Sequence, residues 1–382
     1  MSPIGEFRSF FKTDPGLTHL NNAGLSPINI EAEAVVHYWV ERYRREGMFC
    51  DAAYLEAVDN ARKQLARFLD AEPGSIAFFQ STANAVSQIA FHLNLKPRQE
   101  VIMWDQEYGS HLYPWQEACK RAGADLTLVE SDPMMATPIE KLLAKVSDRT
   151  RVIAISWVQF QSGAISDLKA LAAFAESRGI WTVVDAFQGI GVLPFSFRSV
   201  GIDAVVGGSH KWMTSPVGVG YLCIKQERAR QLIPHNVGAY TFGTCEDPTD
   251  LSCTPKQDAL RFEAGSKQVL EIIALGASAD LIQRCKVETI QKTALDLAQK
   301  LSDGLRALDY HITASNGERQ MTPIVNFSPS EASPLKTVDA IIESLVKNKT
   351  SYARRGPGVR VAPHAHNDIK DVENFLSLLK GR

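Results

Sequence analysis

The stretch from Trp181 to Lys211 reads WTVVDAFQGIGVLPFSFRSVGIDAVVGGSHK and contains two short apolar runs. The first run, WTVV, is followed directly by Asp185, and the second, AVV, is followed by two glycines and then Ser209, His210 and Lys211. Short β-rich runs bounded by turn residues are typical of buried strands. Because ligands bind outside the carboxyl ends of strands in open α/β sheets, Asp185 and Lys211 are expected near a binding site.

Similar runs recur from about residue 76 to residue 224 and alternate with amphipathic stretches. This alternation predicts an α/β protein with a mostly parallel seven-stranded sheet and helices on both faces. The expected strands are 76–79, 101–104, 126–129, 152–155, 181–184, 204–206 and 219–224. Stripes at helical spacing are expected to face the core; they are Val86/Ile89/Ala90/Leu93, Leu168/Leu171/Ala172/Ala175, Val35/Val36/Trp39/Val40/Tyr43 and Leu55/Val58/Leu65/Leu69.

The pattern changes after about residue 255, where a smaller α+β domain is expected. It comprises a long helical stretch at 267–308, a strand at 322–327, a helix at 338–346, a strand near Val359 and a last helix over 369–379. We therefore predict an N-terminal segment (1–30), a large cofactor-binding domain (31–255) and a small C-terminal domain (256–382).

Composition excludes several classes of function. The 41 basic residues nearly balance the 43 acidic ones, so a nucleic-acid partner is not expected. No apolar run approaches the roughly 20 residues of a membrane span, and the first residues do not resemble a secretory signal. Six scattered cysteines without a C-x-x-C pair indicate reduced thiols in a cytoplasmic protein. His364 and His366 alternate on one segment but lack a third ligand, so no metal site is expected.

Four features in the middle of the chain carry chemistry: Ser81-Thr82, Tyr108, Asp185 with Gln188, and Ser209-His210-Lys211. Each has an ordinary explanation alone, such as a helix cap for Ser81 or a solvated surface position for Lys211. Together they provide what pyridoxal 5'-phosphate (PLP) requires. Helix N-termini attract phosphate, a carboxylate keeps the pyridine nitrogen protonated, and a lysine of lowered pKa forms imines.

The chain resembles the class V aminotransferases, a family of fold-type I PLP-dependent enzymes that includes cysteine desulfurases and isopenicillin N epimerase-like proteins. The resemblance covers nearly the whole length and is sharpest at Ser209-His210-Lys211-Trp212. It extends from Leu20-Asn21-Asn22-Ala23-Gly24, through Ser81-Thr82-Ala83-Asn84 and Val184-Asp185-Ala186-Phe187-Gln188, to Arg360-Val361-Ala362-Pro363-His364 and Asn367.

The resemblance implies a role for each matching residue. Lys211 is the Schiff-base lysine and proton shuttle, Asp185 is the partner of the pyridine nitrogen, and Gln188 is the donor to the ring hydroxyl. Tyr108 stacks on the ring, and the phosphate is held by Ser81, Thr82, Ser209 and His210. Gly265-Ser266 reaches the phosphate of the neighbouring subunit, which implies a homodimer with shared sites. Arg360 grips the substrate carboxylate, and Asn22 and His364 lie near the substrate.

Departures from the family bear on the reaction. Cysteine desulfurases carry a nucleophilic cysteine shortly before the carboxylate-binding arginine, whereas residues 351–359 here read SYARRGPGV. Chemistry through an enzyme persulfide is therefore disfavoured, although release of sulfide or selenide from a bound substrate needs no such thiol. Phe160 replaces an asparagine common in desulfurases, and Gln159 or Gln161 is left to face the cofactor. Arg354 and Arg355 are either a second anion contact or a solvated pair.

The motifs specify the cofactor but not the bond that breaks. The leading hypothesis from the sequence is an aminotransferase acting on an amino acid. Epimerisation and carbon–sulfur lysis of the selenocysteine lyase type are the alternatives within the fold. A binding or regulatory protein without activity is the alternative of another class, which the joint presence of Lys211, Asp185 and Arg360 disfavours.

Overall fold

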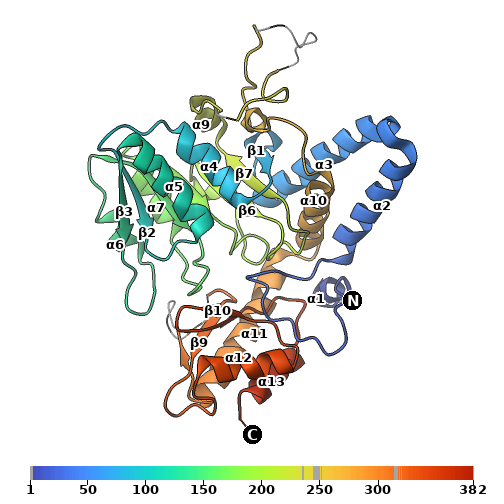
Figure 1. The fold of residues 1–382 in the computed structure, drawn as a ribbon, viewed down its shortest axis with the longest axis vertical. Helices are drawn as coiled ribbons and strands as arrows, with labels where there is room; N and C mark the ends of the chain where they lie inside the picture. The colour runs from blue at the N-terminus through green and yellow to red at the C-terminus, as the bar shows by residue number, and fades with distance from the viewer. Residues whose placement is uncertain are drawn as a thin grey trace.

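A computed structural model describes residues 3–381 except 235, 244–249, 251, 314–316, 318 and 320. It confirms the expected α/β architecture, with a seven-stranded sheet in the upper body of the molecule and a four-stranded sheet in the lower part (Figure 1). No helix in the described part of the chain is long and apolar enough to cross a membrane.

The seven predicted strands all form, in the order β1-β7-β6-β5-β4-β2-β3. They are β1 (Ile76–Phe79), β2 (Glu100–Trp104), β3 (Asp125–Val129), β4 (Thr150–Ser156), β5 (Trp181–Asp185), β6 (Ala204–Gly208) and β7 (Gly220–Ile224). Strands β3, β2, β4, β5 and β6 are parallel, while β7 runs antiparallel to both β6 and β1. The ends of β4 and β5 therefore meet at one edge.

Two layers of helices cover the sheet because successive side chains of a strand point to opposite faces. Val183 packs with α4 (Thr82–His92), α5 (Gly109–Ala122) and α9 (Gln226–Gln231). Val184 packs on the other face, with α3 (Asp51–Leu69), α6 (Ile139–Leu143), α7 (Leu168–Glu176) and α10 (Val269–Arg284). The short α8 (Phe197–Val200) adds Phe197 to this second layer.

The second sheet is antiparallel in the order β10-β11-β9-β8. Its strands are β8 (His311–Ile312), β9 (Val325–Ser328), β10 (Ala353–Arg355) and β11 (Gly358–Val361). A separate core joins it to α11 (Val287–Ala307), α12 (Val338–Lys347) and α13 (Ile369–Leu378) through residues such as Leu301, Leu345 and Phe375. The domain boundary at residues 255/256 stays a prediction.

Two expectations about helices need correction. The single helical stretch expected at 267–308 is two helices, because Lys286 between α10 and α11 adopts a left-handed backbone (φ 64°) that an α-helix cannot continue through. The stripes on α2 (Ile30–Glu46) and α3 are only partly core, since Val40 and Tyr43 of α2 are 49% and 57% exposed and Leu55 of α3 is 41% exposed. The antiparallel pair α2 and α3 extends from the body (Figure 1), so outer residues such as Tyr43, which stacks on Tyr54 of α3 (5.9 Å between ring centroids), keep one side open to solvent.

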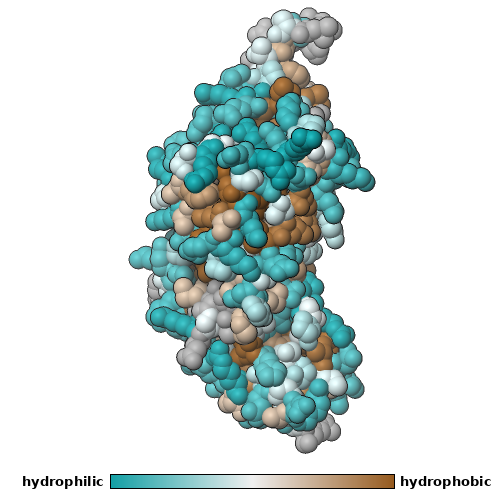
Figure 2. Space-filling view, turned by 90° about the vertical axis from the view of Figure 1, so that its left-hand side faces the viewer, coloured by the Kyte–Doolittle hydropathy of each residue, from teal (hydrophilic) through white to brown (hydrophobic). Residues whose placement is uncertain are grey.

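Further apolar side chains lie on the β3 side of the molecule, where Figure 2 shows them gathered in the upper half of the face. Leu128 of the edge strand β3 is 44% exposed.

Cys50, Cys119, Cys223 and Cys285 are free and buried, as expected of reduced thiols. Cys253 departs from that expectation because it is disulfide-bonded, and Cys245 lies outside the described residues.

Candidate active site

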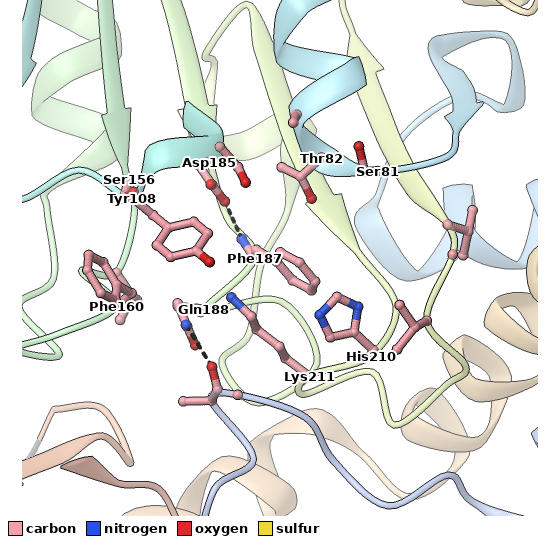
Figure 3. Close-up of a pocket in the computed structure, with 18 of the residues that line it drawn as sticks. Ser81, Thr82, Tyr108, Ser156, Phe160, Asp185, Phe187, Gln188, His210 and Lys211 are labelled. Atoms are coloured by element: carbon pink, nitrogen blue, oxygen red, sulfur yellow. Dashed lines mark hydrogen bonds between the residues drawn. The ribbon is translucent and has the colours of Figure 1, made fainter. Parts of the chain in front are cut away.

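A cavity of about 260 Å³ opens at the edge of the large sheet where β4 and β5 end. It brings together most of the predicted site residues, as Figure 3 shows for those it labels. Ser81, Thr82, Tyr108, Asp185, Gln188, His210, Lys211 and Arg360 all line it. The cavity thus joins residues that are up to 279 positions apart in the sequence.

One end of the cavity is formed by the start of α4. The Ser81 hydroxyl caps this helix by accepting a hydrogen bond from the Asn84 N–H (3.2 Å), and the Thr82 hydroxyl donates to the Gly207 carbonyl (3.2 Å). A Cβ on Gly220 would lie 2.4 Å from the Ser81 carbonyl carbon, so glycine is needed for β7 to approach the helix start this closely. Free N–H groups and hydroxyls at a helix start form a ready site for phosphate.

His210 lies at the same end, with its ring edge-on to Phe187 at 4.9 Å between centroids. Burial, and secondly the charge of Lys211, lower the pKa of His210 to about 4. The imidazole is therefore neutral at pH 7 and contributes a hydrogen bond rather than a charge to this end.

Asp185 ends β5 at the centre of the cavity. Its Oδ1 accepts a hydrogen bond from the Phe187 N–H (2.9 Å). Burial raises the pKa of Asp185, while His111, this hydrogen bond and Lys211 act in the opposite direction. A cationic ring nitrogen next to the carboxylate would favour its ionised form in the same way.

A buried polar cluster supports Asp185 from behind. Glu107, which is fully buried, contacts the Nδ1 of His111 at 3.2 Å and accepts a hydrogen bond from the Ser156 N–H at 2.8 Å. Ser156 pairs with Asp185 in the register of β4 and β5. The Nε2 of His111 is buried and has no hydrogen-bond partner. The cluster therefore fixes both the start of α5 and the end of β4.

Lys211 extends into the middle of the cavity, where its Nζ lies 4.1 Å from the Phe187 ring centroid and 5.6 Å from that of Tyr108. Burial lowers its pKa to about 8; Asp185 opposes this shift, and Arg360 and Arg355 add to it. An amine with this pKa is partly unprotonated near neutral pH, as a nucleophilic lysine requires.

A tight turn holds Lys211 in place. Thr214 has φ 50°, which is an outlier for a β-branched residue, and its N–H donates to the Lys211 carbonyl (3.0 Å). The Asn29 side chain donates to both the carbonyl and the hydroxyl of Thr214, each at 3.0 Å. The N-terminal segment thus supports the turn that carries the lysine.

Gln188 ties the same segment to the cavity wall. Its Nε2 donates to the Ala23 carbonyl (3.0 Å) and its Oε1 accepts from the Trp212 indole N–H (3.0 Å). The second amide proton of Gln188 is left for another acceptor, which is compatible with a ring hydroxyl.

Arg360 forms the opposite end of the cavity and is 1% exposed. Its guanidinium donates to the Phe160 carbonyl (2.7 Å) and to Asn21 Oδ1 (3.2 Å), while its buried Nε has no partner. Among the described residues no carboxylate pairs with it. Burial, then Arg355, lower the pKa of Arg360. An unpaired buried guanidinium is a site for an anionic ligand.

Five predicted residues do not line the cavity: Asn22, Ser209, Gly265, Ser266 and His364. The Asn22 side chain donates to the Ala362 carbonyl and accepts from Ser26. The Ser209 hydroxyl donates to the carbonyls of Pro216 and Val219. His364 is buried with its Nε2 3.1 Å from the Trp212 carbonyl oxygen. Their predicted contacts with cofactor or substrate stay predictions.

Gly265 and Ser266 are exposed and lie away from the cavity of their own chain. This position is compatible with the predicted contact of Gly265 and Ser266 with the cofactor phosphate of a neighbouring subunit. Neither Gln159 nor Gln161, one of which was expected to face the cofactor, lines the cavity; Phe160 between them does. The Gln159 side chain donates to Glu107 (2.9 Å), and that of Gln161 donates to the Met135 sulfur (3.6 Å).

Glu107, His111 and Ser156, which form the buried cluster, carried no sequence signal. Arg355 lines the cavity and Arg354 does not, so the alternatives left open for this pair resolve differently for its two members. A buried glutamate looks like a surface glutamate in the sequence, and only tertiary packing distinguishes them. The histidines gave a weak metal signal, and in the described part of the chain no three potential ligands gather.

The residues that line the cavity fit PLP. Ser81, Thr82 and the start of α4 can hold the phosphate, Asp185 can hold the ring nitrogen, and Lys211 lies between them. Tyr108 and Phe187 offer aromatic surface for the ring.

Similar proteins carry the names of cysteine desulfurases, a C-S lyase and an uncharacterised aminotransferase, YcbU of Bacillus subtilis. The chain is 25% identical to a "Probable cysteine desulfurase" of Pyrococcus abyssi, over 84% of this chain and 82% of that protein. It is 26% identical to another of Synechocystis, over 95% and 90%. Its fold matches the cystine C-S lyase C-DES in complex with cysteine persulfide, with a TM-score of 0.87, 20% identity and coverage of 96% and 98%. A C-DES variant, with a TM-score of 0.88, has glycine covalently linked to its PLP cofactor.

The sequence also matches the family pattern described as aminotransferase class-V over residues 34–350. This match spans most of the chain and includes Ser81, Thr82, Tyr108, Asp185, Gln188, His210 and Lys211, while Ala23, Arg355 and Arg360 lie outside it. The chain therefore belongs to the aminotransferase class-V family of PLP-dependent enzymes.

Proposed function

We propose that this protein is a PLP-dependent carbon–sulfur lyase that releases sulfur from Cβ of a sulfur-containing amino acid. The observation that carries the proposal is a cavity equipped with a lysine, a carboxylate and an arginine but, among the described residues, with no thiol. The sulfur is then released directly, as part of the group that leaves Cβ of the substrate, and is not transferred to a cysteine of the enzyme.

The free cysteines support this distinction. Burial raises the pKa of Cys119 and of Cys285 to about 11, and raises that of Cys223 well above its ordinary value. Because the thiolate is the nucleophile, such thiols are inert at neutral pH. A persulfide on any of these residues is therefore not part of the proposed reaction.

The chain's own residues account for the remaining steps. PLP, when bound, withdraws electrons from the substrate Cα. Arg360 would hold the α-carboxylate, and the unprotonated Nζ of Lys211 would take the Cα proton. Sulfur leaves Cβ with the bonding electron pair and a proton. Hydrolysis of the unsaturated product gives a keto acid and ammonia, which balances the reaction with one water.

This proposal revises the reaction that the sequence favoured. The sequence favours transamination, and one relative is an uncharacterised aminotransferase; the cysteine desulfurases and the C-S lyase among the similar proteins favour elimination. The two reactions share the roles of Lys211, Asp185 and Arg360, and they differ in whether the amino group leaves as ammonia or passes to an acceptor.

The test is product identity with purified holoenzyme. Incubation without any keto acid should give repeated release of products in equal amounts: keto acid, ammonia and sulfide from cysteine, or keto acid, ammonia and cysteine persulfide from cystine. A single turnover that resumes only when a keto acid is added would instead identify a transaminase. Recovery of the amino acid with inverted configuration would identify an epimerase.

Asp185 offers a second test of the cofactor chemistry. Asp185→Ala should still bind PLP weakly but should lose most turnover, because breaking a buried charge pair costs about 3–5 kcal/mol. Asp203→Ala is the control, since Asp203 is equally buried but lies at the other edge of the sheet. Near-normal turnover of Asp185→Ala would assign the role to another group.

We also propose that the active form is a homodimer in which Gly265 and Ser266 complete the neighbouring site. Apolar surface on the α2–α3 pair supports assembly, with Met48 and Phe49 81% and 90% exposed at its tip. Mixing inactive Lys211→Ala subunits with inactive subunits altered at Gly265 and Ser266 should restore activity, because some mixed dimers contain one intact site. No recovery despite subunit exchange would place both groups in one chain's site.

A further inference from the structure

Two neighbouring arginines on β10 have different surroundings. Arg354 is exposed and forms an ion pair with Asp339, with 2.9 Å between Nη1 and Oδ1. Arg355 lines the cavity, and its guanidinium donates from Nη1 to the Arg354 carbonyl (3.0 Å). The Nε of Arg355 is buried without a partner, and no described Asp or Glu pairs with this guanidinium.

The strand register explains the difference. In the β10–β11 hairpin Ala353 pairs with Arg360 and Arg355 pairs with Gly358. Residues two apart on a strand share a face, so Arg355 lies on the same face as Arg360 and diagonal to it. Gly358 places no side chain between the two guanidinium groups. Arg354, one residue away, necessarily points to the opposite face.

The backbone that carries Arg355 is held from two sides. The Asn326 side chain donates to the carbonyls of both Gln161 (3.1 Å) and Arg355 (3.4 Å). A Cβ on Gly356 would lie 2.5 Å from Gln161 Nε2, so the hairpin turn packs tightly on the loop that also supplies Phe160. The Arg355 guanidinium lies 5.7 Å from the Phe160 ring centroid. Its direction into the cavity is thus built into the fold.

The charges at this end of the cavity do not balance with a simple substrate. Arg355 and Arg360 give two positive charges, and Arg355 is one cause of the lowered pKa of Arg360. Among the described residues that line the cavity, Asp185 is the only carboxylate, and it lies at the end of β5 rather than beside the two arginines. One α-carboxylate neutralises one guanidinium and leaves the other as an unpaired charge, which is costly in a partly buried place.

We propose that Arg355 forms a second anion subsite, which binds an acidic group at the far end of the substrate side chain. This inference rests on the proposed lyase function and narrows its substrate to sulfur amino acids that carry a second carboxylate, as a disulfide of two amino acids or a carboxyalkyl thioether does. Arg360 holds the α-carboxylate, and Arg355 holds the distal one.

The test compares ligands that differ only in the distal charge. The probes are 3-(carboxymethylthio)propanoic acid and the amide of its carboxymethyl group; both lack an amino group and therefore bind without reacting. Calorimetric titration of the PLP holoenzyme should give tighter binding of the diacid by roughly tenfold to 100-fold, the range for hydrogen bonds to charged groups.

Three variants separate the possible roles. Arg355→Gln should remove the preference for the diacid and leave the amide's dissociation constant nearly unchanged. Arg354→Gln, the matched neighbour on the outer face, should keep the preference. Arg360→Gln should weaken both ligands. Equal weakening of both ligands in Arg355→Gln would show that both arginines hold one carboxylate, and an absent preference in the unaltered enzyme would also overturn the proposal.

Turnover distinguishes this proposal from the proposed function. With S-carboxymethylcysteine and S-carbamoylmethylcysteine, the subsite predicts a lower KM for the acid that Arg355→Gln abolishes, at similar kcat. If the preference for the diacid is present but neither compound releases keto acid, the lyase function fails and the subsite stands. If both compounds are cleaved equally well by the unaltered enzyme and by Arg355→Gln, the subsite fails and the lyase function stands.

Discussion

The two ends of the cavity both fit anions but do so with different physics. At the α4 end, Ser81, Thr82 and a neutral His210 offer hydroxyls, backbone N–H groups and a helix dipole, with no formal charge. At the β10–β11 end, Arg355 and Arg360 offer two full charges and few other donors. Lys211 lies between the ends, with its amine near the rings of Phe187 and Tyr108 (Figure 3).

The difference matches the ligands proposed for each end. A cofactor that stays bound through many turnovers is suited to a preorganised set of dipoles that needs no rearrangement. A substrate that enters and leaves gains more from charge, because two guanidinium groups attract an anion at a distance and select its geometry. Variants at the two ends should therefore separate cofactor retention from substrate binding.

The largest effect should come from the residue between the ends. Lys211→Ala removes both the covalent attachment and the proton carrier, so turnover should fall by at least about 100- to 10,000-fold. The purified variant should also lose the yellow absorbance that borohydride converts to a stable lysine adduct. Lys120→Ala, on the outer surface of α5, is the control. An unchanged covalent adduct in Lys211→Ala would refute the assignment.

Next in size is the charged end. Arg360→Lys replaces a planar two-point contact by a point charge, so the apparent substrate constant should rise roughly tenfold to 100-fold. The dissociation constant of PLP, measured by dialysis and absorbance, should change much less. If the substrate were a simple amine, neither constant would respond.

The two ends also differ in how far the sequence predicts them. Ser81-Thr82 follows a β-rich run and precedes a helical stripe, so a local pattern predicts a helix start at a ligand-binding edge. Asp185 and Lys211 follow strands in the same way. The seven strands were predictable for the same reason, since each is a short apolar run between turns.

The charged end depends on contacts between distant segments. Whether Arg354 or Arg355 points inward follows from the pairing of Ala353 with Arg360, and a slip of one residue would exchange them. Glu107 is buried because Ser156, Gln159 and His111 surround it, and these contacts span up to 52 positions. Tyr43 on α2 is the opposite case, a residue predicted to lie in the core that is exposed. A helical stripe of apolar residues does not reveal whether another element of the fold covers it.

A smaller effect is expected at the uncharged end. Ser81→Ala removes the cap of α4 and one group at the phosphate position, which costs about 1 kcal/mol and should raise the dissociation constant of PLP roughly fivefold to tenfold. The KM for substrate should stay constant at saturating PLP. Thr337→Ala is the matched control because Thr337 caps α12, far from the cavity, through the Ala340 N–H (3.1 Å). Equal loss of PLP in both variants would reduce the effect to general destabilisation.

The last prediction concerns pH and rests on Lys211, the buried amine that lies between the two ends of the cavity. Its pKa of about 8 lies below the ordinary 10.5, so the unfolded chain binds more protons than the folded apoenzyme between these values. Stability therefore rises with pH across this window, and below pH 8 the buried amine lowers it by a constant amount. After allowance for the cavity's access to solvent, that amount is about 2 kcal/mol. Lys211→Met apoenzyme should accordingly be more stable than the unaltered apoenzyme at pH 7 in urea unfolding, and the difference should shrink between pH 8 and 10.5.

In parallel, the rate at which added PLP develops lysine-linked absorbance should increase up to about pH 8 and then level off. A rate that continued to rise toward pH 10.5 would mean that burial does not lower the pKa of Lys211.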